Sequence, residues 1–413
     1  MNKVRFNPAV SQLGVPAIPQ AASWTHRYDG DYGQLMDFSQ AVPNFKVHQT
    51  VLAELAAQAG TIDSTGYGDI EGEAALRNTY ATHVAGIYGR LITARNIHIT
   101  SGCNQAFVAA LIALAGSGDT VVVCNPCYFN HESTARMLGI NLNYVDCLAE
   151  NNFQPTLQAL EACIDNTVRA IALVSPNNPT GAIYSPQALQ EIFTLCQQRG
   201  IWLILDETYR DFMQVRPRSI EPHSAGSSLN NSITPHDLFG QTDWQNTFIQ
   251  RYSFSKSLSI PGHRLGAITA GVEAVKMIAR VMDNIQICPP RAAQLAVASQ
   301  LLSVQDWIAA NAATIAQRSE LFQAVLKQFP DWKIKSTGAY FAYVEHPYSD
   351  RSSLEVAKSL AQNYGVLTLP GSFFGQRQEG YLRVAFANAD SEVIKQLEGR
   401  FARINERESQ LAD

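Results

Sequence analysis

The strongest constraint on the fold is a series of short β-branched runs that alternate with helical stretches from about Asn96 onward. The runs predicted to be strands are Ile97–Thr100, Thr120–Cys124, Asn141–Val145, Arg169–Val174, Trp202–Leu205, Phe248–Tyr252 and Leu265–Ala270. The stretches predicted to be helices are Gln105–Ala115, Glu132–Leu138, Pro186–Arg199 and Glu273–Asp283. Apolar strands that are separated by helices form largely parallel sheets covered on both faces. We therefore predict an α/β fold built on a mostly parallel, seven-stranded sheet.

The chain outside this block has a different pattern, with a long predicted helix over Trp307–Phe329 and a short strand at Tyr340–Val344. A chain of 413 residues with 46% hydrophobic content can bury more than one core. We expect a large domain over residues 46–299 and a smaller α+β domain made of residues 1–45 and 300–413.

Composition argues against several classes of partner. The net charge of −5 comes from 31 basic and 36 acidic residues without strong segregation, which argues against nucleic acid or an anionic membrane. The longest apolar run, Ala106–Gly116, has 11 residues and is too short to cross a bilayer. No signal-peptide pattern is present, and the lone pair Cys124 and Cys127 lacks a second pair to complete a metal site. We expect a soluble, cytoplasmic protein without a metal.

Two charged residues stand directly after apolar runs, at the strand ends where parallel sheets bind ligands. Asp206 follows Ile201–Leu205, and Lys256 lies in Ser253-Phe254-Ser255-Lys256 after another run. A buried charge is costly unless it is paired. Asp206 is therefore either part of an internal salt bridge or cap, or an anion for a protonated ring nitrogen. Lys256 alone would be a surface lysine, whereas attachment to an aldehyde would remove its charge.

A helix start and two further polar residues form a candidate phosphate site. Ser101-Gly102-Cys103-Asn104 leads into a helix, and free amides at a helix start favour a phosphate, although any capped helix has this pattern. Ser253 and Arg264 add a hydroxyl and a cation. Aldehyde, ring nitrogen and phosphate are the functional groups of pyridoxal 5'-phosphate (PLP), the cofactor that these residues suit.

Three further residues suit the ring of such a cofactor. Tyr128 could stack on the ring, and Tyr209 and Asn178 could hydrogen-bond its phenolic oxygen. Each also has a plain structural interpretation, since Asn178 lies in the turn-like segment Pro176–Gly181 and Tyr128 could simply pack. The dinucleotide, Walker, zinc-protease and serine-hydrolase motifs are absent.

Together these motifs resemble the class I/II aminotransferases of the aspartate aminotransferase superfamily, which have the PLP-dependent transferase fold type I. The pieces that carry the resemblance are Tyr67-Gly68, Ser101-Gly102, Pro126-Cys127-Tyr128, Pro176–Gly181, Asp206–Tyr209, Ser253–Lys256, Gly262–Arg264, Leu369–Ser372 and Leu382–Val384. The resemblance implies an aminotransferase that moves an amino group from an L-amino acid to a 2-oxo acid by a ping-pong mechanism.

The resemblance also implies roles for individual residues. Lys256, Asp206 and Tyr209 would be catalytic, with Lys256 bonded to the aldehyde carbon of PLP and Asp206 facing its ring nitrogen. The residues implied to contact PLP are Tyr67, Gly102, Cys103, Asn104, Tyr128, Asn178, Asp206, Tyr209, Ser253, Ser255, Lys256 and Arg264. Those implied to contact the substrate are Ala41, Asn178 and Arg383, the last through the α-carboxylate. Tyr67 would reach the phosphate of the neighbouring subunit, which implies a homodimer with shared active sites.

Several positions depart from the family pattern or leave its implications open. Ala41 stands where the family usually has a glycine, Cys103 replaces another small residue, and a polar insertion spans about Arg218–Pro235. Arg291 either approaches the partner's site or simply starts a helix. A preference for neutral or aromatic substrates is suggested by the aromatic residues expected near the entrance, Trp24, Tyr28, Tyr32 and Phe373.

Two alternatives to amino transfer remain. The same residues would also serve another PLP reaction, such as β- or γ-elimination, C–S lyase chemistry or annulation. A more distant alternative is a PLP-sensing transcription regulator. That type carries an N-terminal DNA-binding domain, and it is disfavoured because the resemblance already begins by about Asp37.

Overall fold

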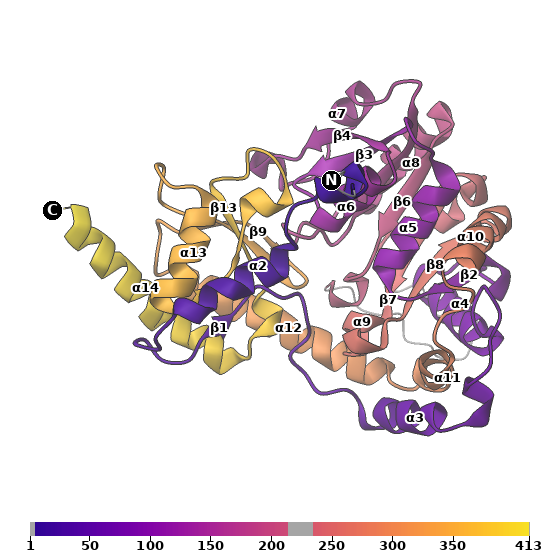
Figure 1. The fold of residues 1–413 in the computed structure, drawn as a ribbon, viewed down its shortest axis with the longest axis horizontal. Helices are drawn as coiled ribbons and strands as arrows, with labels where there is room; N and C mark the ends of the chain where they lie inside the picture. The colour runs from indigo at the N-terminus through magenta and orange to yellow at the C-terminus, as the bar shows by residue number, and fades with distance from the viewer. Residues whose placement is uncertain (1–4, 214–233, 413) are drawn as a thin grey trace, which may run out of the picture.

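The computed structural model describes residues 5–213 and 234–412, and the side chains up to residue 406. Figure 1 shows two lobes, one around a large sheet and the other around a smaller sheet formed mainly by the C-terminal part of the chain. Most of the polar insertion, residues 218–233, lies outside the described residues.

The large sheet contains the seven predicted strands, in the order β2-β8-β7-β6-β5-β3-β4. Their bounds are β2 Ile97–Thr100, β3 Thr120–Asn125, β4 Asn141–Asp146, β5 Val168–Val174, β6 Trp202–Asp206, β7 Phe248–Ser253 and β8 Gly266–Ala270. The strands from β7 to β4 pair in parallel, which confirms the prediction of a mostly parallel sheet. In contrast, β8 runs antiparallel to both β7 and β2. It follows β7 after only the short helix α9 (Phe254–Ser257) and a 3₁₀ turn, without the crossover helix that usually joins parallel strands.

Helices cover both faces of this sheet because successive side chains of a strand point to opposite sides. In β3, Val121 and Val123 belong to one core, whereas Val122 and Cys124 belong to the other. The helices that join the first core are α5 (Cys103–Leu114), α6 (Phe129–Met137) and α10 (Val272–Ile285). Those that join the second core are α3 (Gln49–Ala59), α4 (Ala74–Tyr88), α7 (Leu157–Ala162), α8 (Pro186–Arg199) and α11 (Arg291–Gln300).

The smaller lobe combines the N-terminal segment with the C-terminal part of the chain. Its antiparallel strands are, in order, β12 (Leu369–Pro370), β13 (Tyr381–Val384), β10 (Phe341–Glu345) and β9 (Lys333–Gly338). A separate parallel pair joins β1 (Met36–Asp37) to β11 (Val366–Leu367). The helices that share this lobe's core are α2 (Ala17–Trp24), α12 (Gln305–Leu326), α13 (Ser353–Tyr364) and α14 (Ser391–Ala412).

Helix α12 connects the two lobes (Figure 1). Its Ile308 belongs to a core of the large lobe, whereas Ile315 and Phe322 belong to the core of the small lobe. The pairing of β1 with β11 agrees with a small domain assembled from both ends of the chain. The boundaries at 46–299 stay a prediction.

Within residues 5–213 and 234–412, no helix is long and apolar enough to cross a membrane. Over the same residues, no group of three or more histidine, cysteine or acidic residues is arranged to hold a metal ion.

Candidate active site

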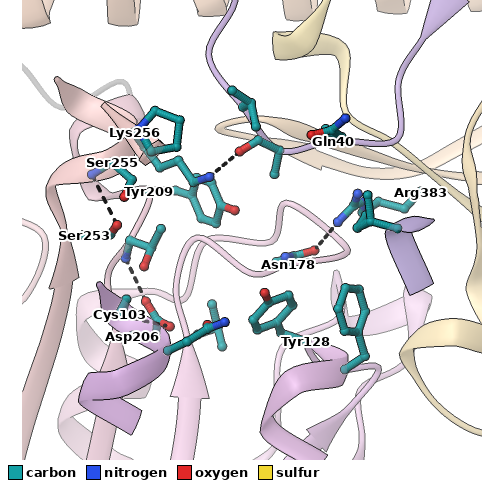
Figure 2. A pocket seen from close by; sticks show the side chains of 18 of the residues that line it. Gln40, Cys103, Tyr128, Asn178, Asp206, Tyr209, Ser253, Ser255, Lys256 and Arg383 are labelled. Atoms are coloured by element: carbon teal, nitrogen blue, oxygen red, sulfur yellow. Dashed lines mark hydrogen bonds between the residues drawn. The ribbon is translucent and has the colours of Figure 1, made fainter. Parts of the chain in front are cut away.

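A cavity of about 280 Å³ lies between the two lobes, and Figure 2 shows the side chains that line it. The predicted site residues among its lining are Ala41, Cys103, Asn104, Tyr128, Asn178, Asp206, Tyr209, Ser253, Ser255, Lys256, Arg264 and Arg383. Ala41 and Arg383 come from the small lobe and the others from the large one. The fold therefore brings together residues that are distant in the sequence.

The cavity lies at one edge of the sheet because β5, β6 and β7 are parallel and end in register. Asp206 closes β6 and pairs with Val174 at the end of β5 and with Arg251 in β7. Ser253 closes β7, and α9 with Lys256 follows at once. Parallel strands of an α/β sheet present their carboxyl ends at a common edge, where ligands bind.

Lys256 is held in the cavity with its amine against the small lobe. Its Nζ donates a hydrogen bond of 2.5 Å to the backbone carbonyl of Ala41 (Figure 2). Burial, together with the positive charges of Arg264 and Arg383, lowers the pKa of Lys256 to about 8. A substantial fraction of the amine is therefore neutral near physiological pH, which is the form that attacks a carbonyl carbon.

The start of α5 and the residues beside it form a recess suited to a phosphate. Gly102 has φ +85°, and a Cβ there would lie 2.2 Å from Nη2 of Arg264, so the glycine leaves room for that guanidinium. No side chain caps α5, which leaves its first amides available. The Ser253 hydroxyl accepts from the Ser255 amide at 3.3 Å. The buried Ser255 hydroxyl has no partner among the described residues.

Asp206 is buried below the cavity and is fixed by several donors. Its Oδ1 accepts from the Thr208 amide at 2.9 Å, and its Oδ2 accepts from the Arg251 guanidinium at 2.9 Å. The Cys103 thiol lies 3.6 Å from the same Oδ2. Burial and the Asp206 charge raise the pKa of Cys103 to about 12, so it remains a thiol.

Arg383 presents a buried guanidinium on the opposite side of the cavity from Ser253 (Figure 2). It donates to Asn178 Oδ1 at 3.0 Å and to the backbone carbonyl of Ser39, and it lies 5.1 Å from the ring centroids of Phe341 and Phe374. Burial lowers its pKa to about 10, so it is still charged at neutral pH. Its Nε has no partner among the described residues. A cation of this kind suits a carboxylate.

Two predicted residues do not line the cavity. Gly102 is outside the lining, although a Cβ there would lie 2.2 Å from Arg264 Nη2. The Tyr67 side chain is 80% exposed and is not part of its own chain's cavity lining. Arg291 also lies elsewhere: it begins α11, is 2.5 Å from Glu73 Oε1 and donates to the backbone carbonyl of Asp63. These contacts also place Arg291 beside Gly66 and Gly68, which flank Tyr67, and both interpretations of Arg291 stay predictions.

Sequence reasoning missed several residues at the cavity. Those in the lining are Ile18, Val42, Phe129, Val174, Thr208 and Pro261. Arg251, which donates to Asp206, and His131, which accepts from Arg251, were also missed. Arg251 had a detectable signal, because a charged residue inside the predicted strand Phe248–Tyr252 must find a buried partner.

The cavity at the carboxyl edge of the sheet thus holds Lys256, Asp206 and Arg264, three of the residues on which the resemblance to fold type I aminotransferases rests. The family model for aminotransferase class I and II matches residues 33–401. The chain belongs to this family, whose members use PLP, and it is an aminotransferase.

Relatives with assigned activities are distant but match most of the chain. The valine–pyruvate aminotransferase of Mycobacterium tuberculosis is 27% identical over 400 residues, covering 96% of this chain and 97% of that protein. The aspartate aminotransferase of Sulfolobus acidocaldarius is 25% identical and covers 88% of each chain. The aromatic aminotransferase of Arabidopsis thaliana is 26% identical and covers 85% of this chain and 84% of its own.

Solved structures of similar fold include a mutant of the aspartate aminotransferase of Thermus thermophilus. It has a TM-score of 0.85 at 21% identity and covers 97% of this chain and 100% of its own. The fold type predicted from the sequence motifs is thereby confirmed.

Proposed function

We propose that this aminotransferase binds PLP in the cavity and transfers the amino group of an L-amino acid to a 2-oxo acid by a ping-pong mechanism. The observation that carries the proposal is the position of Lys256. Its amine, with a pKa of about 8, lies in one cavity with Asp206 and with Arg383. When bound, the cofactor supplies an electron-withdrawing ring that stabilises negative charge at the substrate Cα.

Residues of the large lobe would hold the cofactor. The amides at the start of α5, Ser253, Ser255 and Arg264 supply donors for its phosphate. Asp206 supplies the anion for its ring nitrogen. The remaining cofactor contacts in the proposal come from Gly102, Cys103, Asn104, Tyr128, Asn178 and Tyr209.

Substrate would enter from the side of the small lobe. Arg383 would bind the α-carboxylate with the help of Asn178, to which it is already hydrogen-bonded at 3.0 Å. Lys256, once released from its covalent link, would take the proton from Cα, and a positioned base of this kind contributes about 10²–10⁴-fold in rate. The hydrogen bond to the Ala41 carbonyl supports this role, because it holds the amine toward the small lobe.

The substrate side chain is proposed to be neutral, either aliphatic or aromatic. The residues that line the cavity outside the cofactor set and Arg383 carry no charge: Ile18, Gln40, Ala41, Val42, Phe129, Val174, Thr208 and Pro261. The cations of the described lining are Lys256, Arg264 and Arg383, and the proposal uses all three elsewhere. The names of the relatives do not decide the donor, since they include aspartate, aromatic and valine–pyruvate aminotransferases.

The active unit is proposed to be a homodimer. Tyr67 is 80% exposed in the isolated chain, although a tyrosine is usually at least half buried. A partner subunit would cover it and place it near the neighbouring phosphate site.

The test is a half-reaction on the purified protein. With a neutral L-amino acid alone, the absorbance of bound PLP should convert to that of pyridoxamine phosphate, and a 2-oxo acid should restore it. Borohydride should trap the cofactor on Lys256, and Lys256→Ala should abolish both trapping and turnover. Release of ammonia without exchange with an oxo acid would instead establish elimination.

A further inference from the structure

Asp206 forms a buried ion pair with an arginine that the sequence did not identify as a site residue. Arg251 stands inside β7 and is 1% exposed. Its Nη2 donates to Asp206 Oδ2 at 2.9 Å and to His131 Nε2 at 3.0 Å, and its Nη1 donates to the Cys103 carbonyl at 3.2 Å. The guanidinium carbon lies 4.5 Å from the Phe107 ring centroid. A full charge at this depth requires a partner of opposite sign, and Asp206 is that partner.

His131 does not help to balance the charge of Asp206. It is buried, and burial together with Arg251 lowers its pKa to about 3, so it is neutral. Its Nε2 accepts a hydrogen bond from Arg251 and therefore carries no proton. The 3.9 Å between Nε2 and Asp206 Oδ2 is too long for a hydrogen bond. The imidazole thus orients the Arg251 guanidinium, and Arg251 alone of these two residues balances the negative charge of Asp206.

The other groups that face Asp206 carry no charge at neutral pH. Cys103, at the start of α5, is a thiol with a pKa near 12. Burial also raises the pKa values of the Tyr128 and Tyr209 hydroxyls. Arg251 is therefore the cation that opposes the burial of the Asp206 carboxylate within the part of the chain that the structure describes.

Asp206 retains acceptor capacity toward the cavity that it lines. A carboxylate has about four acceptor sites, of which the Thr208 amide, the Arg251 guanidinium and the Cys103 thiol occupy three. A carboxylate buried without a cation gains a proton more readily, because burial disfavours its charged form. It would then compete with a ring nitrogen for the proton between them.

We propose that Arg251 is a positioning residue for the cofactor: its guanidinium pairs with the Asp206 carboxylate at 2.9 Å and holds it in place, so that the shared proton stays on the ring nitrogen. This inference rests on the proposed function, because it concerns a ring nitrogen bound against Asp206. Arg251 does not line the cavity and would act through the carboxylate.

The direct test uses the holoenzyme loaded with PLP that carries nitrogen-15 in its ring. Near neutral pH, Arg251→Met should move the ring-nitrogen resonance toward the value of an unprotonated pyridine, and Arg251→Lys should remain closer to the parent enzyme. Arg318→Met is the matched control, since Arg318 is a buried arginine in α12 that donates to the Ala387 carbonyl and does not line the cavity. It should lower stability without moving the resonance. An unmoved resonance in Arg251→Met would overturn the proposal.

A second measurement does not need the cofactor. Arg251→Met and Asp206→Asn each leave one buried polar partner unmatched, so each should lower the melting temperature of the full-length protein. The double variant removes both charges and should melt above Arg251→Met alone, because a buried ion pair can be replaced as a unit at little cost. Additive losses would show that the two residues are not coupled and would refute the inference. If the parent protein binds no PLP, the proposed function fails while this second result still decides the pairing.

Discussion

At the scale of single residues, the candidate site depends on buried charged side chains, which either form ion pairs or keep a hydrogen-bonding atom available for a ligand. Arg383 illustrates this, because its two terminal nitrogens are bound to Asn178 and Ser39 while Nε has no partner among the described residues. A guanidinium held in this way can bind a planar carboxylate with a geometry that an ammonium cannot reproduce.

We therefore expect Arg383→Lys to lower kcat/KM for amino acids by about 2–4 kcal/mol, mostly through a higher KM. PLP retention should be unchanged, because the proposed cofactor contacts do not include Arg383. Steady-state kinetics with a panel of amino acids would measure the loss. Arg400→Lys is the control, since Arg400 is a buried arginine of the small lobe that bonds Tyr28 and lies outside the cavity. Equal reactivity of amines that lack a carboxylate would contradict the role of Arg383.

At the scale of elements, the junction between β2 and α5 sets the geometry of the phosphate recess. Gly102 turns the chain with φ +85°, a conformation that costs an L-residue about 1–3 kcal/mol. The missing side chain also leaves space for Arg264, which itself has φ +50°. The turn and the cation therefore fit together only when residue 102 is glycine.

Gly102→Ala should therefore weaken PLP binding by tenfold or more and destabilise the fold by about 1–3 kcal/mol. PLP titration followed by absorbance, and urea unfolding, would separate the two effects. Gly118→Ala is a matched control, because Gly118 has φ +91° with nothing within 4 Å of a built Cβ. It should show a similar loss of stability with unchanged PLP affinity. If both variants bound PLP equally well, the recess at Gly102 would not be the phosphate site.

At the scale of the whole molecule, one exposed residue motivates the proposed dimer. Tyr67 is 80% exposed, and its neighbour Gly68 contacts the start of α11 through Cys288 and Arg291. The segment is thus held in place by its own chain while the tyrosine side chain stays exposed. We propose that a partner subunit covers Tyr67 in the dimer, which explains its exposure in the single chain.

Sedimentation velocity should accordingly show a dimer at micromolar concentrations, and Tyr67→Phe should lower PLP retention through loss of one hydroxyl bond, about 0.5–1.5 kcal/mol. Tyr144→Phe, in the edge strand β4, is the control and should retain PLP normally. A fully active monomer would rule out the shared site.

The sequence alone determined the local features of this protein. Apolar runs with helical stretches between them predicted the seven strands and their mostly parallel sheet, because strand and helix periodicity are local properties. The positions of Lys256 and Asp206 after such runs indicated the edge where both side chains now line one cavity.

Only the tertiary structure decided how distant residues meet. Strand β8 runs antiparallel to β7 because the connection between them is too short to form a crossover. Ile18, Val42 and Phe129 line the cavity because the two lobes pack against each other. The pairing of Arg251 with Asp206 was likewise visible only once β6 and β7 were aligned in register. Sequence shows that a buried charge needs a partner, but the identity of that partner is fixed by through-space packing between segments far apart along the chain.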